Sequence, residues 1–435
     1  MNIRRLAIAL ASKCEAAGQY SNIALDSAIK KYGVEGADRG LLTLLTYGII
    51  ERRITLDYII DSMSSIPPSK IERDTRDILR LGIYQLLYTD KIPDHAAINE
   101  TVELASKRSK GFVNALLREF LRRGRTVDYP DREKNEVEYL SVKYSFPREI
   151  CEIFLRDFGG DKTESLFEAF SRTVDITLRV NTLKISRDEL IERFKNNGID
   201  CEPTKYSPNG IRLIGKTPLC DIPGDSDGLW FVQDEASQIC TAAAGVMAGD
   251  FVIDTCACPG GKSFAMAADM KKGEILSCDI HENKLSLIER GAQRLSIDFI
   301  KTKAQDARVI CPEFCERADV VLCDVPCSGF GVFAKKPDIR YKSVSDTERL
   351  PEIQRAILYN CSKYVKVGGT LLYSTCTLLT RENEDNVNRF LSENPQFEPV
   401  DFEVGGIESG DGVLTLYPDI HGTDGFFVAK MKRIK

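Results

Sequence analysis

Two short motifs in the C-terminal half of the chain place thiols and a carboxyl group where apolar runs end. The first motif is DVPCSG at 324–329, which joins Asp324 to Cys327 across a proline. The second motif is YSTCT at 373–377, which supplies another thiol, Cys376, at the end of the run GTLLYSTC. Ligands of open α/β sheets bind outside the carboxyl ends of the strands, so we expect the chemistry of this protein at these positions.

The two motifs alone do not exclude other roles for the cysteines, namely as core residues, metal ligands or a redox pair. Buried cysteine is a common core residue, and a core role is favoured for three that lie in strand-like runs: Cys256, Cys278 and Cys323. A metal site is disfavoured because no close C-x-x-C pair exists, and we expect no metal. Its candidate ligands would be Cys311, Cys315, Cys323 and Cys327. A redox dithiol made of Cys327 and Cys376 is possible, but it would leave Asp324 without a role.

A glycine-rich stretch, CACPGGKSFA at 256–265, resembles a phosphate-binding loop at first sight. That loop needs a glycine five residues before the Gly-Lys pair, and Cys256 stands there instead, so the pattern fails. The dinucleotide fingerprint G-x-G-x-x-G fails as well. What remains is a strand, a Pro-Gly-Gly turn, a helix, and a second strand that ends in Asp279, where an acid can meet ribose hydroxyls. This combination favours a nucleoside cofactor without phosphates, and S-adenosylmethionine is the common one.

Two thiols and an acid facing a methyl donor fit the methylation of carbon 5 of cytosine. This carbon is not nucleophilic in the ground state, but a thiolate that adds to C6 makes it so, which is covalent catalysis. An acid at N3 stabilises the adduct, and Asp324 is the candidate. A base must then remove the C5 proton before the first thiolate leaves, and the second cysteine suits that role.

The elements that must position these residues fall into three regions. From about residue 236, apolar runs alternate with helical stretches, which predicts a parallel sheet with helices on both faces. Residues 129–235 predict linker helices and a small α/β module, with Ser186 as the N-cap of one helix. Residues 1–128 show a period of 3.6 residues, as in GFVNALLREFLRR, which predicts a helical bundle. We therefore expect domains at 1–128, 129–235 and 236–435.

Composition and charge exclude some classes of protein. The chain has 435 residues and a net charge of −6, but residues 1–130 carry 20 Lys and Arg against 16 Asp and Glu. A basic region on an acidic protein suggests a polyanionic partner, and a solvated helix face explains it equally well. No apolar run is long enough to span a membrane. The scattered cysteines favour a reducing, cytoplasmic location.

The motifs resemble, in one order along nearly the whole chain, those of the RNA 5-methylcytosine methyltransferases and of their small-subunit rRNA branch. The matching stretches are ILRLGIYQLLYTDKIPDHAAINETVELA, GFVNALLREFLRR, LRVNTLKISRDEL, VQDEASQ, DTCACPGGKS, CDI, QDAR, DVPCSGFGVFAKKPDIRY, YSTCTLLTRENEDNV and HGTDGFFVAKMKR. The resemblance implies a NusB-like helical RNA-binding domain, a small RRM-like α/β module and a Rossmann-like class I methyltransferase domain. It also implies S-adenosylmethionine as cofactor and 16S rRNA as partner, free or in an early small-subunit intermediate, with cytosine 967 as the target. We expect a monomer without a membrane partner.

The resemblance also implies roles for single residues. Cys376 aligns with the nucleophile, Cys327 with the cysteine that assists product release, Asp324 with the acid near the target base, and Lys262 with an active-site position. The positions implied to contact the cofactor are Cys256, Ala257, Cys258, Pro259, Gly260, Gly261, Lys262, Asp279, Asp306 and Asp324. Cys258 departs from the family, which usually has alanine there. Two alternatives stay open: an enzyme of this family that acts on tRNA or another rRNA site, and a non-catalytic NusB-like RNA-binding factor.

Overall fold

The computed structural model describes residues 2–17, 21–215 and 217–435, and the chain forms two compact units. Unit 1 contains the residues up to Ser171 together with the segment Phe333–Val344, and unit 2 contains Arg172–Val332 and Ser345–Lys435. The predicted domain boundaries at 128 and 235 do not coincide with this division, and they remain predictions. No helix in the described part of the chain is both long and apolar enough to cross a membrane.

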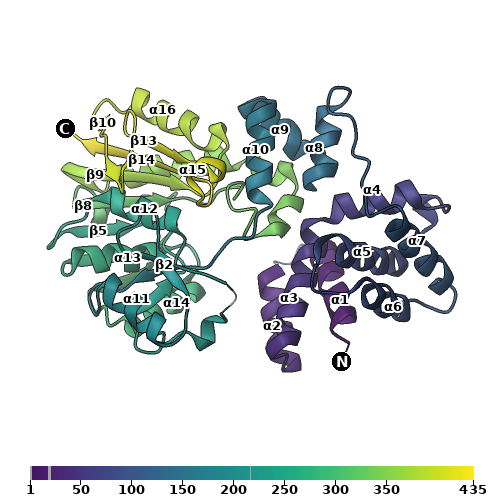
Figure 1. The fold of residues 1–435 in the computed structure, drawn as a ribbon. Coiled ribbons are helices and arrows are strands. Elements are labelled where there is room, and N and C mark those ends of the chain that lie inside the picture. The colour runs from purple at the N-terminus through teal and green to yellow at the C-terminus, as the bar shows by residue number, and fades with distance from the viewer. Residues whose placement is uncertain (1, 18–20, 216) are drawn as a thin grey trace. The chain divides into compact units, whose positions relative to one another are not determined.

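Unit 1 is helical, as the periodicity predicts (Figure 1). The apolar stripe of the stretch at 111–123 is buried at Val113, Leu117 and Phe120, so the core of the unit forms where the pattern predicts it. The helices are α1 (Ile3–Ala17), α2 (Ser21–Tyr32), α3 (Gly36–Glu51), α4 (Arg53–Met63), α5 (Arg73–Tyr88), α6 (Asp94–Leu104), α7 (Lys110–Arg122), α8 (Glu136–Tyr144), α9 (Arg148–Phe158) and α10 (Gly160–Phe170).

The segment Phe333–Val344, here called the inserted segment, completes the core of unit 1 although it is distant in sequence. The ring of Phe333 is fully buried, and its centroid lies 5.0 Å from that of Phe146, 6.2 Å from that of Phe154 and 5.1 Å from that of Phe170. Aromatic pairs at such separations stabilise a core beyond the area that they bury. The inserted segment is therefore an integral part of the helical unit.

A buried arginine fixes the C-terminal half of the inserted segment. Arg340 is fully buried, and its guanidinium donates to the backbone oxygens of Tyr144 and Phe170, each at 3.1 Å. The guanidinium also lies 4.2 Å from the centroid of the Phe146 ring. Buried polar groups need such partners, so these carbonyl oxygens hold the segment in one position.

Unit 2 begins with a small α/β module. Its antiparallel sheet has the order β2-β3-β1-β4 and packs on helix α11. Ser186 caps α11, because its hydroxyl oxygen accepts from the backbone N–H of Glu189 while the Glu189 carboxylate accepts from that of Ser186, as a capping box. The predicted cap is therefore confirmed. The bounds are β1 (Thr177–Val180), α11 (Arg187–Asn196), β2 (Cys201–Pro203), β3 (Gly210–Leu213) and β4 (Trp230–Val232).

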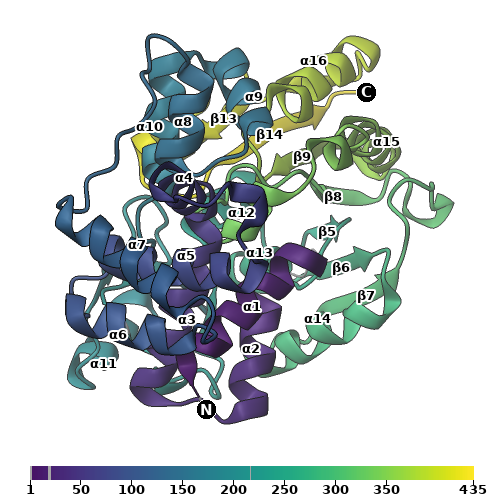
Figure 2. The same ribbon diagram turned by 90° about the vertical axis from the view of Figure 1, so that its right-hand side faces the viewer.

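The larger sheet of unit 2 has the order β10-β14-β9-β8-β5-β6-β7, with β13 beside β14 (Figure 2). Strands β5 to β9 are parallel, as predicted, whereas β14 joins β9 antiparallel and extends the sheet. The bounds are α12 (Glu235–Ala244), β5 (Phe251–Asp254), α13 (Gly261–Met270), β6 (Glu274–Asp279), α14 (Glu282–Leu295), β7 (Ile300–Ala304), β8 (Ala318–Asp324), α15 (Leu350–Ser362), β9 (Val365–Thr375), α16 (Glu384–Glu393), β10 (Phe397–Pro399), β11 (Glu403–Val404), β12 (Ile407–Glu408), β13 (Val413–Leu416), α17 (Pro418–His421) and β14 (Phe426–Arg433).

Both faces of this sheet are covered, which explains why its central strands are mainly apolar. Val252 packs into the core with helices α12, α13 and α14, and its neighbour Ile253 packs into the core with α15 and α16. Cys278 and Cys323 are buried in the second of these cores, so the core role favoured for them is confirmed.

Candidate active site

The predicted site residues lie at the carboxyl ends of neighbouring strands. Asp254 ends β5, Asp279 ends β6 and Asp324 ends β8, while Cys376 follows directly after β9. The strands β8 and β9 pair in parallel, with Asp324 opposite Ser374. The carboxyl ends of parallel neighbours share one edge of the sheet, so residues far apart in sequence come together here.

The two cysteines are in contact. The Sγ atoms of Cys327 and Cys376 lie 3.2 Å apart. Backbone bonds hold their loops together, because Val325 N–H donates to the oxygen of Ser374 at 3.1 Å and Gly331 N–H to that of Cys376 at 3.0 Å. The hydrogen bond with Cys376, together with burial, raises the pKa of the Cys327 thiol well above its usual value. This shift favours the thiol form of Cys327.

Lys262 and Asp324 form a partly buried ion pair. Lys262 Nζ lies 2.7 Å from Asp324 Oδ2, and Ser374 Oγ donates to Asp324 Oδ1 at 2.8 Å. Burial alone would lower the pKa of the Lys262 ammonium, but the charge and hydrogen bond of Asp324, together with Cys240 and Cys376, outweigh burial, and the pKa lies above its usual value. Lys262 is thus a permanent cation directed at the acid of the DVPCSG motif, whereas a phosphate-binding loop would direct it at a phosphate.

The Pro-Gly-Gly turn leads from β5 into α13. Ala257 N–H donates to the oxygen of Cys278 at 2.7 Å, which fixes the turn beside β6. Gly260 has φ of 108°, and a Cβ there would lie 2.5 Å from the ring of Phe264, so only glycine fits. The Sγ of Cys258, the residue that departs from the family, donates to the oxygen of Lys284 at 3.2 Å.

The two remaining predicted carboxylates lie near the ends of β6 and β7. Asp279 Oδ1 accepts from the N–H of His281 at 2.9 Å. Asp306 pairs with the Arg308 guanidinium at 2.7 Å, and hydrogen bonds from Arg308 hold the pKa of Asp306 below its usual value. Both side chains are partly exposed, so both can accept further hydrogen bonds from a ligand.

Asp254 also lies at this edge, although it was not predicted as a site residue. It is fully buried, and Ser263 Oγ donates to its Oδ2 at 2.7 Å, while Oδ1 has no hydrogen-bond partner within the described residues. Burial raises the pKa of Asp254 to about 7. A serine at the third position of the helix after a strand-end aspartate is the signal that points to this pair.

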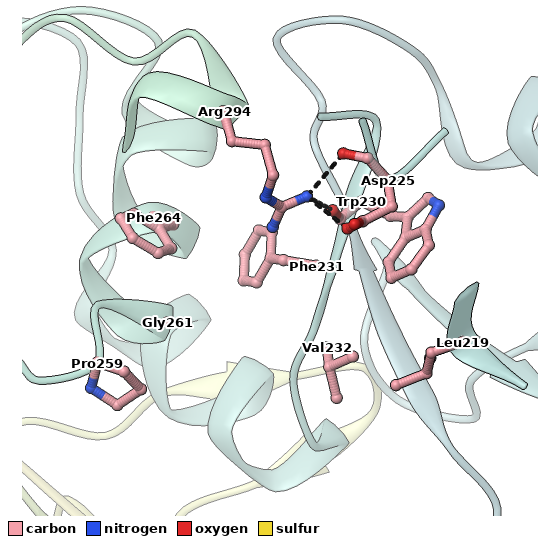
Figure 3. Close-up of a pocket in the computed structure, with 9 residues that line it drawn as sticks. All are labelled: Leu219, Asp225, Trp230, Phe231, Val232, Pro259, Gly261, Phe264 and Arg294. Carbon is pink, nitrogen blue, oxygen red and sulfur yellow. Dashed lines mark hydrogen bonds and ion pairs between the residues drawn. The ribbon is translucent and has the colours of Figure 1, made fainter. Parts of the chain in front are cut away.

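A pocket of roughly 520 Å³ borders the outer side of the turn (Figure 3). It shares Pro259 and Gly261 with the turn, but its walls are formed by residues such as Trp230 and Phe264, without the carboxylates that end β6 and β8. Arg294 in its wall donates to Asp225 at 2.8 Å. This pocket is therefore distinct from the edge at which the predicted site residues meet.

Potential metal ligands do not gather in the described residues. No group of three or more His, Cys, Asp or Glu side chains lies close enough to hold an ion there. The four cysteines weighed above as ligands form no such group.

An open parallel sheet, with carboxylates at its strand ends beside a glycine turn and a thiol pair, defines a Rossmann-like methyltransferase. Residues 245–432 match the family described as 16S rRNA methyltransferase RsmB/F, residues 1–122 match the NusB family, and residues 146–219 match the ferredoxin-like domain of RsmF/B-like methyltransferases. The chain belongs to the 16S rRNA methyltransferase RsmB/F family and is an enzyme.

Individual relatives agree with this assignment. A probable ribosomal RNA small subunit methyltransferase B of Bacillus subtilis (strain 168) is 37% identical over 99% of both chains. A protein of the same description from Synechocystis sp. (strain ATCC 27184 / PCC 6803 / Kazusa) is 33% identical over 100% of both. The crystal structure of PH0851 superposes with a TM-score of 0.79 at 28% identity, covering 99% of this chain and 98% of that one.

Proposed function

We propose that this enzyme transfers a methyl group from S-adenosylmethionine to carbon 5 of a cytidine in 16S rRNA, with cytosine 967 as the target. The observation that carries the proposal is the contact of two thiols, 3.2 Å apart, beside the Lys262–Asp324 ion pair. One thiol can add to the base while the other assists its release. The relatives named above are described as small-subunit rRNA methyltransferases, which supports the substrate.

In this reaction the Cys376 thiolate attacks C6 of the cytosine and makes C5 nucleophilic. Asp324 is fixed by Ser374 and Lys262, and we assign to it the hydrogen bond at N3 that stabilises the adduct. After C5 has bonded to the methyl group, Cys327 takes the proton from C5, the electron pair forms the C5–C6 double bond, and the bond between C6 and the sulfur of Cys376 breaks.

The pKa of Cys327 can change in step with this cycle. In the free enzyme Cys376 is the largest cause of the raised pKa of Cys327, first through the hydrogen bond and also through its charge. Once Cys376 is bonded to C6 it is a neutral thioether, and both effects disappear. The pKa of Cys327 then falls, so the thiol can release its own proton to solvent, and the resulting thiolate accepts the C5 proton at the stage where a base is needed.

The cofactor fits the edge formed by residues 256–262, Asp279 and Asp306. The turn has no room for a Cβ at Gly260 because the ring of Phe264 fills that place, which fixes the shape of the turn at this edge. The buried Oδ1 of Asp254 lacks a partner among the described residues, and the carboxylates of Asp279 and Asp306 suit ribose or amino groups. When bound, the cofactor supplies the electrophilic methyl group.

The helical unit is proposed to bind the RNA, and the whole enzyme to act in the cytoplasm as a monomer. Its N-terminal part matches the NusB family, and residues 1–130 carry the excess of Lys and Arg. A cytidine in tRNA or at another rRNA position is the alternative target. Bisulfite sequencing of rRNA and tRNA from a strain that lacks the enzyme identifies the nucleotide that loses its methyl group.

The two cysteines are distinguished by single replacements. Cys376→Ala cannot form the adduct with C6, so it should be inactive and never linked to RNA. Cys327→Ala should still attack and transfer the methyl group but should then stall, and it should give a protein–RNA band on a denaturing gel. The double variant should lose this band. A band from Cys376→Ala, and none from Cys327→Ala, would reverse the assignment.

A further inference from the structure

A cluster of buried polar side chains lies beside the thiol pair, and none of them was predicted as a site residue. We call it the Glu382 cluster, and it consists of Ser328, Gln354, Thr377, Glu382 and Asn386. Each of these residues is at most 1% exposed. They come from the Cys327 loop, helix α15, the Cys376 loop and helix α16, so the cluster joins segments that are far apart in sequence.

The cluster holds the backbone on both sides of Cys327. Gln354 Nε2 donates to the oxygen of Pro326 at 3.0 Å and to Glu382 Oε2 at 2.7 Å. The same carboxylate oxygen accepts from the N–H of Ser328 at 3.0 Å. The residues before and after Cys327 are thus both tied to one carboxylate, directly or through one amide.

The cluster also holds the segment that carries Cys376. Ser328 Oγ donates to Thr377 Oγ1 at 2.8 Å, which joins the residue after Cys327 to the residue after Cys376. The Tyr373 hydroxyl donates to the backbone oxygen of Glu382 at 2.6 Å. The distance between the two sulfur atoms therefore depends on these bonds.

Burying the charged carboxylate of Glu382 costs folding free energy. Its side chain is fully buried, the donors to its carboxylate are a backbone N–H and an amide, and Oε1 has no hydrogen-bond partner among the described residues. Burying a charged carboxylate whose hydrogen-bond donors are neutral costs several kcal/mol. A neutral side chain would fill this place at lower cost if only packing mattered.

The groups that face Cys327 explain what the charge does. They are Cys376, Tyr373 on β9 and Glu382, whereas Lys262 of the Lys262–Asp324 pair interacts with Cys376. After the hydrogen bond with Cys376 and burial, the charge of Glu382 is a further cause of the raised pKa of Cys327. When Cys376 is bonded to RNA, Glu382 is the negative group of this set that still acts on Cys327.

We propose that Glu382 and Gln354 are positioning residues for the product-release step: they hold Cys327 against Cys376, and the charge of Glu382 sets the pH at which Cys327 accepts the C5 proton. This inference rests on the proposed two-cysteine function. Neither residue touches the RNA or the cofactor; each acts through Cys327.

The test uses the full-length enzyme with Glu382→Ala, Glu382→Gln and Gln354→Ala, with the exposed Glu393→Ala as control. Glu382→Ala and Gln354→Ala release the Cys327 loop, so they should accumulate the denaturation-resistant RNA adduct and lose at least about tenfold in steady-state turnover. Methyl transfer in a single turnover should stay within about twofold of wild type, because Cys376 still attacks. Glu393→Ala should behave as wild type.

Glu382→Gln tests the negative charge separately from the hydrogen bonds. Its amide oxygen can accept both hydrogen bonds that Oε2 accepts, so the loop should stay in place. Removing the negative charge lowers the pKa of Cys327, and the pH at which adduct release reaches half of its maximum rate should shift downward. A purely structural role for the carboxylate would leave this profile unchanged.

The outcomes separate the inference from the proposed function. If Cys327→Ala forms no adduct, the two-cysteine function itself is wrong. If Cys327→Ala traps RNA but folded Glu382→Ala and Gln354→Ala do not, the inference is overturned. Should the alanine variants fail to fold by circular dichroism, the pH profile of Glu382→Gln decides, and an unshifted profile rejects the role of the charge.

Discussion

Replacing Asp254 with asparagine should stabilise unit 2 more in alkaline than in mildly acidic solution. The carboxyl group is fully buried, and burial raises its pKa from 3.8 to about 7. An acid whose pKa is raised by folding binds its proton more tightly in the native state. Its contribution to stability is therefore complete below pH 3.8, the unfolded value, and is lost as the pH rises through about 7.

The size of the effect follows from the shift. One pKa unit corresponds to about 1.4 kcal/mol, so the shift from 3.8 to about 7 corresponds to a loss of about 4 kcal/mol by pH ~8. About 2 kcal/mol of this loss falls between pH ~5.5 and pH ~8. Asparagine does not titrate, and its amide oxygen still accepts from Ser263. The stability of Asp254→Asn minus that of wild type should therefore increase by about 2 kcal/mol across this interval.

The single tryptophan of the chain makes this measurable. Trp230 is buried and lies in the same unit as Asp254, so its fluorescence during urea unfolding reports on unit 2. The exposed Asp298→Asn serves as control and should show no pH-dependent difference. A stability difference for Asp254→Asn that is the same at both pH values would refute the reasoning.

Two further predictions concern unit 1. Phe333→Ala removes a fully buried ring from three aromatic partners and should cost roughly 3–5 kcal/mol, measured as a lower thermal midpoint by far-UV circular dichroism; an unchanged midpoint would show that the ring is not packed there. Replacing Arg118, Arg122 and Arg123 by glutamine should weaken RNA binding and reduce the slope of log affinity against log salt by about one to two units. We expect less than one unit for each arginine, because Arg122 and Arg123 already pair with Glu119. An unchanged slope would leave these arginines as a solvated helix face.

Local patterns explain why the site edge was predictable. The runs that end in Asp279, Asp324 and Cys376 are mainly apolar, which is typical of parallel strands covered on both faces, and strand ends of such a sheet share an edge. The cap at Ser186 was predictable because the two residues that form a capping box lie within four consecutive positions of the sequence. In each case the information lies in a short window of sequence.

Features that depend on distant contacts were not predictable. In the sequence, Glu382 is one of several acidic residues in the stretch RENEDN at 381–386. Only the fold places its carboxylate within hydrogen-bond distance of Ser328 and Gln354. Phe333 and Arg340 belong by sequence to the stretch after the Cys327 motif, yet their partners lie in helices α8 to α10 and beside them. No periodicity encodes such pairings, because each depends on chain positions that are more than twenty residues apart.

The inserted segment also bears on the order in which the protein folds during synthesis. Helices α8 to α10 leave the ribosome long before Phe333 and Arg340 are made, and roughly three quarters of the chain must be translated before the core of unit 1 can close. In that interval the rings of Phe146, Phe154 and Phe170 lack one of the partners against which they pack in the complete unit. The N-terminal unit of this protein is thus begun first but completed only when part of the C-terminal half has been translated.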